Sequence, residues 1–329
     1  MTATGLGPTP DASDNPLDVA ALAGPRAGER RRWAAASRPV WEERPSPFSK
    51  VFKGILLTVL AIVMVFPFVY VIAVSFSSYA DVVRGGLILW PKNPTLEAYE
   101  AVMKGGIVTR ALLVSVALTL GGTLLDVIMT VTLAYGLSRP GVPGRRFVLA
   151  LVLLTLLFAP GIIPNYLLVK QLGLLDTYAA LILPGLINAF NLVILRNFFM
   201  SLPTEILESA RLDGASDWRI LWNITLPLSK AVLAVVALFY GVAHWNEFFA
   251  ATLYLNDAEK WPIQLVLRQY VLQGGSLADA AVIDPNQPPP PAQTLQMAVV
   301  VIATIPILIV YPFLQKYFTQ GVLSGAIKG

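Results

Sequence analysis

The feature that most constrains this chain is a series of long apolar blocks that carry almost no charge. A helix needs about 20 apolar residues to cross the hydrocarbon core of a bilayer. Backbone polar groups inside lipid must be paired within the protein, which favours helices for such blocks. We therefore predict an all-α membrane protein with six transmembrane helices in one domain, residues 51–329, with spans at 54–76, 111–136, 147–169, 178–199, 228–250 and 294–314.

Composition narrows the chemistry that is open to the chain. Hydrophobic residues make up 56% and charged residues 13%, and there are no cysteines and one histidine, His244. Thiol chemistry, disulfide frameworks and histidine-rich metal sites are therefore excluded, and we expect no metal and no cofactor. His244 near Glu247 could act as an acid–base pair. No nucleophile elbow or metalloprotease motif accompanies it, however, so we do not expect an enzyme.

The first 50 residues are rich in Ala, Pro, Gly and Arg and lack a steady hydrophobic period, which is typical of disorder. The run Arg30–Arg32 stands too far from the first apolar block for a twin-arginine signal, so we expect no cleaved leader. With both termini inside, most of the 24 Lys and Arg residues fall on the cytoplasmic side, in agreement with the positive-inside rule. We expect this basic tail to set the topology, and we expect no nucleic-acid partner.

Asp126 stands in the middle of the second apolar block. A carboxylate at the centre of an isolated span costs about 2.5–3.5 kcal/mol, so the residue should face protein or water. It either lines a polar conduit or is capped by a neighbouring hydroxyl, that of Thr123 or Thr130.

Prolines interrupt two of the predicted spans. Pro160 and Pro164 fall in the third and Pro184 in the fourth. Each removes a backbone donor, so we expect kinks or local gaps at these points.

Residues 201–227, between the fourth and fifth spans, read as two short helices around a glycine. Ser201 and Pro203 are start signals, Gly214 suits a left-handed helix end, and Ser216 suits a second N-cap. Five apolar residues in this loop require a cover: Trp218, Ile220, Leu221, Trp222 and Ile224. Acidic residues outnumber basic ones here, which favours a protein partner with a basic groove over a helix lying on anionic lipid.

The stretch Glu208-Ser-Ala-Arg-Leu-Asp-Gly214-Ala-Ser, followed by Ile224-Thr-Leu-Pro227, resembles the EAA motif of binding-protein-dependent ABC permeases. Ser209 stands where the motif has its first alanine, and both residues are small. The resemblance implies a coupling helix that docks on a cytoplasmic ATPase subunit, with Glu208 pairing to a basic residue and Gly214 at the bend. The residues that it implies for coupling are Glu208, Ala210, Asp213, Gly214, Ile224, Leu226 and Pro227.

Three further stretches are similar to the carbohydrate branch of this family, in particular to G-type subunits of maltose-like importers. They are Tyr135-Gly-Leu-Ser-Arg139, His244-Trp-Asn-Glu-Phe and the ending that begins at Tyr311-Pro-Phe-Leu-Gln-Lys. Together with Trp90-Pro-Lys, the ending most resembles permeases of oligosaccharides or polysaccharides. The likeness covers roughly residue 50 to the end.

The chain has no Gly-x-x-x-x-Gly-Lys-Ser/Thr phosphate loop, so ATP must be hydrolysed by another chain if it drives transport. An ion-driven secondary carrier, or an ABC permease for a non-sugar solute, remains an alternative. The resemblance implies a sugar importer in the bacterial cytoplasmic membrane, with lipid around it. Its partners are then a second related permease, two ATPase subunits and an extracytoplasmic solute-binding protein.

Three further segments have two interpretations each. Trp245, Asn246 and Glu247 either line an outer vestibule for sugar or, with His244, form an interfacial cluster anchored at the headgroup level. The outer loop, residues 255–293, contains the proline run Pro288–Pro291 and either reaches a binding protein or is a passive connector. The tail, residues 315–329, either is frayed or, as the G-type resemblance implies, inserts between the ATPase subunits.

Overall fold

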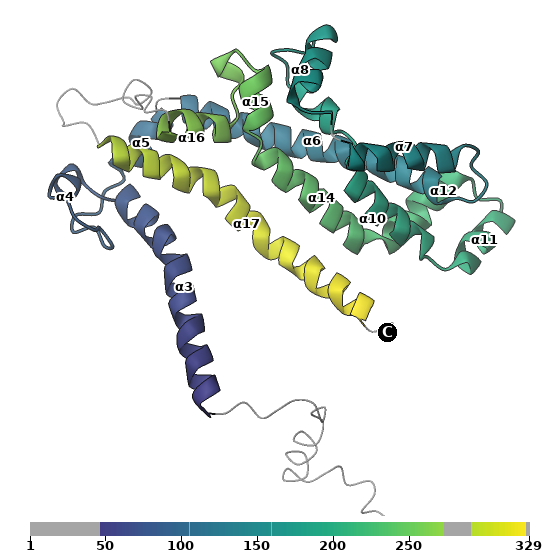
Figure 1. Ribbon diagram of the computed structural model, residues 1–329, viewed down its shortest axis with the longest axis horizontal. Helices are drawn as coiled ribbons and strands as arrows, with labels where there is room; N and C mark the ends of the chain where they lie inside the picture. The colour runs from purple at the N-terminus through teal and green to yellow at the C-terminus, as the bar shows by residue number, and fades with distance from the viewer. Residues whose placement is uncertain (1–46, 105, 159, 273–290, 327–329) are drawn as a thin grey trace, which may run out of the picture. The chain divides into compact units, whose positions relative to one another are not determined.

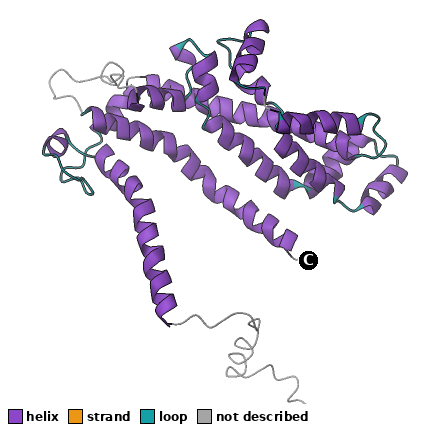
Figure 2. Cartoon of the chain, viewed as in Figure 1, coloured by secondary structure: helices purple, strands orange, loops and turns teal. Residues whose placement is uncertain are grey.

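The computed structural model describes residues 47–104, 106–158, 160–272 and 291–326. Contacts divide the chain into residues 1–64 and 65–329, which we describe separately. Of the first unit, only the beginning of helix α3 (Pro47–Ser75) is described. Most of the predicted disordered tail, the run Pro288–Pro290 and the last three residues therefore lie outside the described residues. The described residues form helices joined by loops and turns, with an isolated bridge between Ser77 and Pro94 and no strand among them (Figure 2).

Helix α6 (Ile107–Ser138) is the central element of the second unit (Figure 1). Its 32 residues rise about 48 Å, enough to cross a bilayer. The buried positions recur every three or four residues along one face, and several of them are small: Ala111, Ser115 and Gly122. Small residues let neighbouring helices approach closely. Helices α10 (Ala189–Met200) and α14 (Lys230–Trp245) pack most extensively against this face.

Three hydrophobic clusters follow one another along α6. Near its start it packs with α5 (Glu97–Lys104), α16 (Ile263–Leu272) and α17 (Ala292–Ala326). Farther along it meets α8 (Ile162–Gln171), α9 (Ala179–Ile182) and α15 (Phe249–Tyr254). Toward its end it packs with α7 (Arg145–Leu157) and α10. The remaining elements are short: α4 (Tyr79–Val83), η1 (Leu183–Gly185), α11 (Thr204–Leu212), α12 (Asp217–Ile220), η2 (Leu221–Thr225), α13 (Leu226–Leu228) and η3 (Ala258–Lys260).

The count of six continuous spans is not confirmed. Three described helices are long and apolar enough to cross a membrane, namely α3, α6 and residues 292–312 of α17, and bent helix pairs raise this number to at most five. The block predicted at 147–169 is two helices, because α7 ends at Leu157 and α8 begins at Ile162. The block predicted at 178–199 bends by 51° between η1 and α10.

Prolines account for these two breaks, as the sequence predicts. Pro160 lies between α7 and α8, where Gly161 has a φ of 86° and continues the interruption. Pro184 lies inside the 3₁₀ turn η1, directly before the bend. Proline lacks a donor and clashes with the preceding turn, which favours a break at each of these points, although α3 continues through Pro67 and α17 through Pro306.

Candidate functional site

The loop after α10 has the predicted form of two short helices around a glycine. Helix α11 begins at Thr204 directly after Pro203 and ends before Gly214, whose φ of 78° is left-handed. Ser216 caps α12 by accepting the backbone N–H of Arg219. Only Ser201 was assigned wrongly: its hydroxyl donates to the carbonyl of Phe198, so it closes α10 and does not start α11.

The loop has a hydrophobic core of its own. Leu207 and Ala210 of α11 are buried against Ile220 of α12, and Ala215 and Ile224 pack on them. Ala210 is therefore an internal contact, at a position where α11 and α12 leave room for a small side chain. Because its two helices share a core, the loop forms a compact unit.

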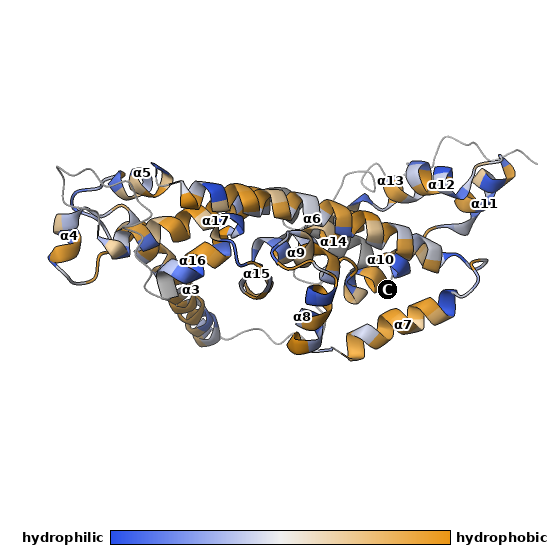
Figure 3. Cartoon of the chain, turned by 90° about the horizontal axis from the view of Figure 1, so that it is seen from above, coloured by the Kyte–Doolittle hydropathy of each residue, from blue (hydrophilic) through white to orange (hydrophobic). Residues whose placement is uncertain are grey.

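The outer surface of this loop is both acidic and apolar. Glu205, Glu208 and Asp213 are exposed. The most exposed of its large apolar side chains are Leu212 at 89%, Trp218 at 62% and Trp222 at 60%. Ile220 and Leu221, by contrast, are covered by the chain itself. The prediction that a partner covers apolar residues therefore applies to the two tryptophans. Figure 3 shows that α11 and α12 have mixed hydropathy, whereas α7 is mostly apolar.

Two side chains at the end of α6 hold the loop. The hydroxyl of Tyr135 donates to the carbonyl of Asp217 at 3.1 Å. Arg139 donates to the Thr225 hydroxyl at 3.4 Å, and its guanidinium lies 4.2 Å from the centre of the Tyr135 ring. In the sequence, Tyr135 and Arg139 stand out only as part of a stretch that resembles the carbohydrate branch, and their contacts with the loop were not predicted. The available signal was an arginine four residues after a tyrosine at the end of an apolar helix.

The other predicted coupling residues lie around this attachment. Asp213 ends α11, and Gly214 makes the turn. Leu226 is half-buried and packs against the cluster at the end of α6, whereas Pro227 is exposed in α13. The segment from α12 to α13 then bends by 86° into α14, so the loop is continuous with the helix that packs on α6.

Asp126 does not bond with either threonine that the sequence suggested. Its carboxylate is 1% exposed and lies 2.7 Å from Nε2 of His244, which comes from α14. The Thr130 hydroxyl bonds instead with that of Tyr240, and the Thr123 hydroxyl has no partner within the described structure. The error arose because a partner 118 residues away is invisible to local spacing.

The four residues His244, Trp245, Asn246 and Glu247 differ in burial and in their contacts. Trp245 is buried in the core near the start of α6. Asn246 donates to the Val242 carbonyl of its own helix, and Glu247 accepts the backbone N–H of Ala250 at the start of α15. These residues end one helix and begin the next.

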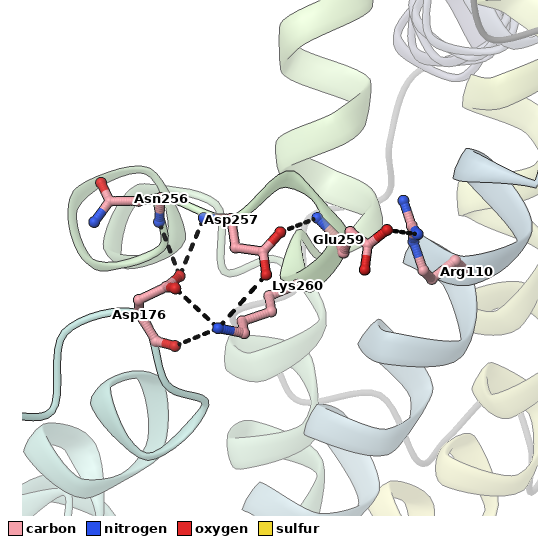
Figure 4. A network of polar contacts seen from close by, with 6 residues as sticks. All are labelled: Arg110, Asp176, Asn256, Asp257, Glu259 and Lys260. Carbon is pink, nitrogen blue, oxygen red and sulfur yellow. Dashed lines mark hydrogen bonds and ion pairs between the residues drawn. The ribbon is translucent and has the colours of Figure 1, made fainter.

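A polar network joins three distant parts of the chain near the start of α6 (Figure 4). Asp176, with a φ of 60°, accepts the backbone N–H groups of Asn256 and Asp257, both at 3.1 Å. Lys260 donates to the Asp176 carboxylate at 2.8 Å and to its carbonyl at 2.9 Å. Arg110 of α6 reaches Glu259 at 3.0 Å. The hydrogen bond with Lys260 lowers the pKa of Asp176 and raises that of Lys260.

A known protein family matches the part of the chain that contains this loop. The family model described as "Binding-protein-dependent transport system inner membrane component" matches residues 131–324. This match includes the whole loop and its attachment to α6.

Two relatives from Bacillus subtilis (strain 168) are similar along most of their length. The polygalacturonan/rhamnogalacturonan transport system permease protein YtcP is 47% identical over 283 residues, which are 86% of this chain and 98% of the relative. Protein LplC is 48% identical over 267 residues, 81% of this chain and 90% of the relative.

A solved structure has the same fold. It is one chain of a bacterial ABC transporter involved in the import of the acidic polysaccharide alginate, with a TM-score of 0.77 and 31% identity. The match covers 85% of this chain and all of that one. The architecture around α6 is thus that of an importer permease.

Proposed function

The chain belongs to the family of binding-protein-dependent transport system inner membrane components, and from that premise we propose that it is a permease subunit of an ATP-driven oligosaccharide importer. The names of its relatives support a saccharide as the solute, because YtcP is named for polygalacturonan and rhamnogalacturonan transport. The related solved transporter also takes an acidic polysaccharide. The substrate class is therefore an oligosaccharide or polysaccharide fragment, with uronic-acid chains as the first to test.

The observation that carries the proposal is the folded loop from Thr204 to Leu228. It has a core of its own, an exposed acidic and aromatic surface, and fixed connections to α6 and α14. A surface of this kind suits docking, because exposed tryptophans supply contact area and carboxylates select a basic partner. We assign Glu208 the ion pair with the ATPase, and Gly214 the turn that presents it.

The mechanism follows from these connections. When two ATPase subunits close on ATP, the loop moves with them and pushes on α14 directly and on α6 through Tyr135 and Arg139. A solute-binding protein and a second permease complete the pathway on the other side and within the membrane. ATP binding can drive the change from the inward-open to the outward-open state only if the free energy of ATP binding differs between these two states.

The membrane arrangement is also part of the proposal. At 13 residues, α7 rises about 20 Å, too little to cross the membrane alone. We assign α7 and α8 together to one crossing, which, with α3, α6, the α9–α10 pair, α14 and α17, makes six. Both termini and the loop then lie in the cytoplasm, where basic residues are preferred.

Replacing Glu208 by Lys tests the docking surface. Reversal of the charge should reduce the amount of ATPase subunit that copurifies with the permease and should lower uptake, because a favourable ion pair becomes a repulsion. The matched control is Glu100→Lys, an exposed glutamate on α5, outside the loop. Equal recovery of the ATPase with both variants contradicts the assignment.

One observation favours a second candidate, an ion-driven carrier. The buried Asp126–His244 pair is the kind of intramembrane ionisable group that proton carriers use. Vesicles that contain this polypeptide as their sole protein distinguish the two. Solute uptake on an ion gradient without ATP would establish the carrier and refute the importer subunit.

A further inference from the structure

A small cavity lies between α10 and α14, apart from the loop and its attachment. Its volume is about 270 Å³, and it is open on one side. The residues that line it are Asn188, Phe190, Asn191, Phe239, Tyr240 and Ala243. The size is close to the lower end for small-molecule sites, roughly 300 Å³. The cavity opens at the bend where η1 gives way to α10, and broken helices in transporters commonly form solute sites.

One polar side chain in this cavity is buried and unused. Asn191 is 4% exposed, and its side-chain amide has no hydrogen-bond partner among the residues that the structure describes, although its backbone N–H donates to Asn188. The amide is not fully buried, so it can bond with water or with a ligand at the cavity. The amide offers two donors and an acceptor to whatever occupies the cavity.

The cavity is held in shape by a second set of hydrogen bonds. The Tyr240 hydroxyl accepts the backbone N–H of Asn188 at 2.9 Å and bonds with the Thr130 hydroxyl of α6 at 2.7 Å. Asn188 caps α10 through its Oδ1, so its NH₂ group is also free within the described structure. These hydrogen bonds connect the helices α6, α10 and α14 beside the cavity, so the cavity is preformed.

Aromatic rings flank the free amides. Phe190 and Phe239 lie with ring centroids 6.3 Å apart, and both are exposed beside the cavity. Apolar faces together with a few convergent hydrogen-bonding groups are the pattern of a specific small-molecule site. A pyranose ring matches this pattern because its C–H face packs on an aromatic ring while its hydroxyls bond with amides. No charged residue lines the cavity, so it suits the hydroxyls of a sugar ring whose carboxylate points out through the opening, and a bare ion is a poor match.

We propose that this chain itself holds one sugar ring of the passing oligosaccharide, packed on the exposed side of the Phe190–Phe239 pair and hydrogen-bonded to the side chains of Asn188 and Asn191. This inference rests on the proposed function and adds to it a solute subsite within this subunit. Selectivity is then set partly by the permease and not only by the binding protein.

Replacing Asn191 by Leu tests the subsite, because leucine has the same branched shape, although it is larger, and cannot form hydrogen bonds. In proteoliposomes with the complete complex and binding protein, uptake of labelled trigalacturonate should fall roughly tenfold, as expected when a solute loses a buried hydrogen-bonding partner. The matched control is Asn197→Leu, an exposed asparagine of α10 that does not line the cavity. Its uptake should stay within twofold of the wild type.

Uptake by Asn191→Leu within twofold of the wild type overturns the subsite but leaves the importer intact. If the wild-type complex takes up no saccharide but moves another solute, the proposed function fails instead. ATPase activity and monodispersity of the purified Asn191→Leu complex show whether it has folded.

A second measurement does not depend on the folding of that variant. A photoreactive benzoylphenylalanine at position 239, in an otherwise wild-type complex, should capture labelled trigalacturonate on illumination, and excess unlabelled trisaccharide should prevent this. Capture of the neighbouring permease or of lipid, with no saccharide, overturns the proposal, since these aromatic rings then face a protein or the bilayer.

Discussion

Gly122 and His244 meet where α6 crosses α14. A Cβ at position 122 would lie 2.7 Å from Nε2 of His244, the atom that bonds with Asp126. At the same time, Gly122 stands one helical turn before Asp126 on the buried face. The absence of a side chain at this position therefore makes room for the buried pair.

Gly122→Ala should displace the imidazole and destabilise the protein by roughly 1–3 kcal/mol, through crowding and the weakened hydrogen bond. The measurement is the thermal unfolding temperature of the purified protein. Gly121→Ala is the matched control, because a Cβ there meets nothing within 4 Å. Equal unfolding temperatures for the two variants would refute this account of the glycine.

The Asp126–His244 pair should behave as a unit. His244→Leu leaves a buried carboxyl without a partner and should cost about 3–5 kcal/mol, whereas replacing both residues by Leu should recover much of that loss. Thermal unfolding of the two single variants and the double variant measures this coupling. The exposed ion pair Lys104–Glu100 gives the comparison, with about 0–1 kcal/mol expected. Strictly additive effects for Asp126 and His244 would contradict the pairing.

At the scale of elements, the end of α6 and the folded loop form a joint. The contacts through Tyr135 and Arg139 are few and polar, while Leu221 packs in the cluster at the end of α6. Polar contacts specify the orientation, and apolar packing supplies most of the stabilisation.

Tyr135→Phe should weaken the contact between the end of α6 and the folded loop without unfolding the loop. The lost bond to the Asp217 carbonyl contributes about 0.5–1.5 kcal/mol, so the chain should still assemble, with less solute moved for each ATP hydrolysed. The measurement is the ratio of uptake to ATP hydrolysis in proteoliposomes. Tyr79→Phe, on the exposed face of α4, is the control. An unchanged ratio for Tyr135→Phe would show that the hydroxyl plays no part in coupling.

At the scale of the whole molecule, α6 connects two polar regions, the loop at its end and the Asp176–Lys260 network near its start. The network ties the segment after α8 to the segment after α15. Movement at one end of α6 can therefore be resisted or transmitted at the other.

The network predicts a pH dependence. The pKa of Asp176 is lowered from 3.8, so its contribution to stability is present above that value and is lost as the pH falls through the lower pKa of the folded state. The pKa of Lys260 is raised from 10.5, so its contribution is present below that value and is lost at higher pH.

The difference in unfolding temperature between wild type and Asp176→Asn should be constant from about pH 5 to pH 9 and should shrink below about pH 4. The test is to measure the thermal unfolding temperatures of both proteins from below about pH 4 up to about pH 9. Asp213→Asn, at an exposed position in the loop, is the control. A difference that grows as the pH falls would contradict the sign of the Asp176 effect.

What the sequence determined by itself is local. Apolar blocks of span length, proline breaks, the left-handed turn at Gly214 and the cap at Ser216 follow from backbone sterics and side-chain type over a few neighbouring residues. The EAA motif is equally local, and the family match confirms the membership that it indicates. The sequence alone was therefore sufficient to predict a helical permease embedded in a membrane.

Tertiary structure alone decided which side chains meet. Asp126 finds His244 across 118 residues, Tyr135 finds Asp217 across 82, and Lys260 finds Asp176 across 84. Such pairs depend on how helices cross and where they break, and helical periodicity specifies a face without naming its partner. The unused amide of Asn191 is likewise visible only once α10 and α14 enclose it, because burial is a property of the packed chain.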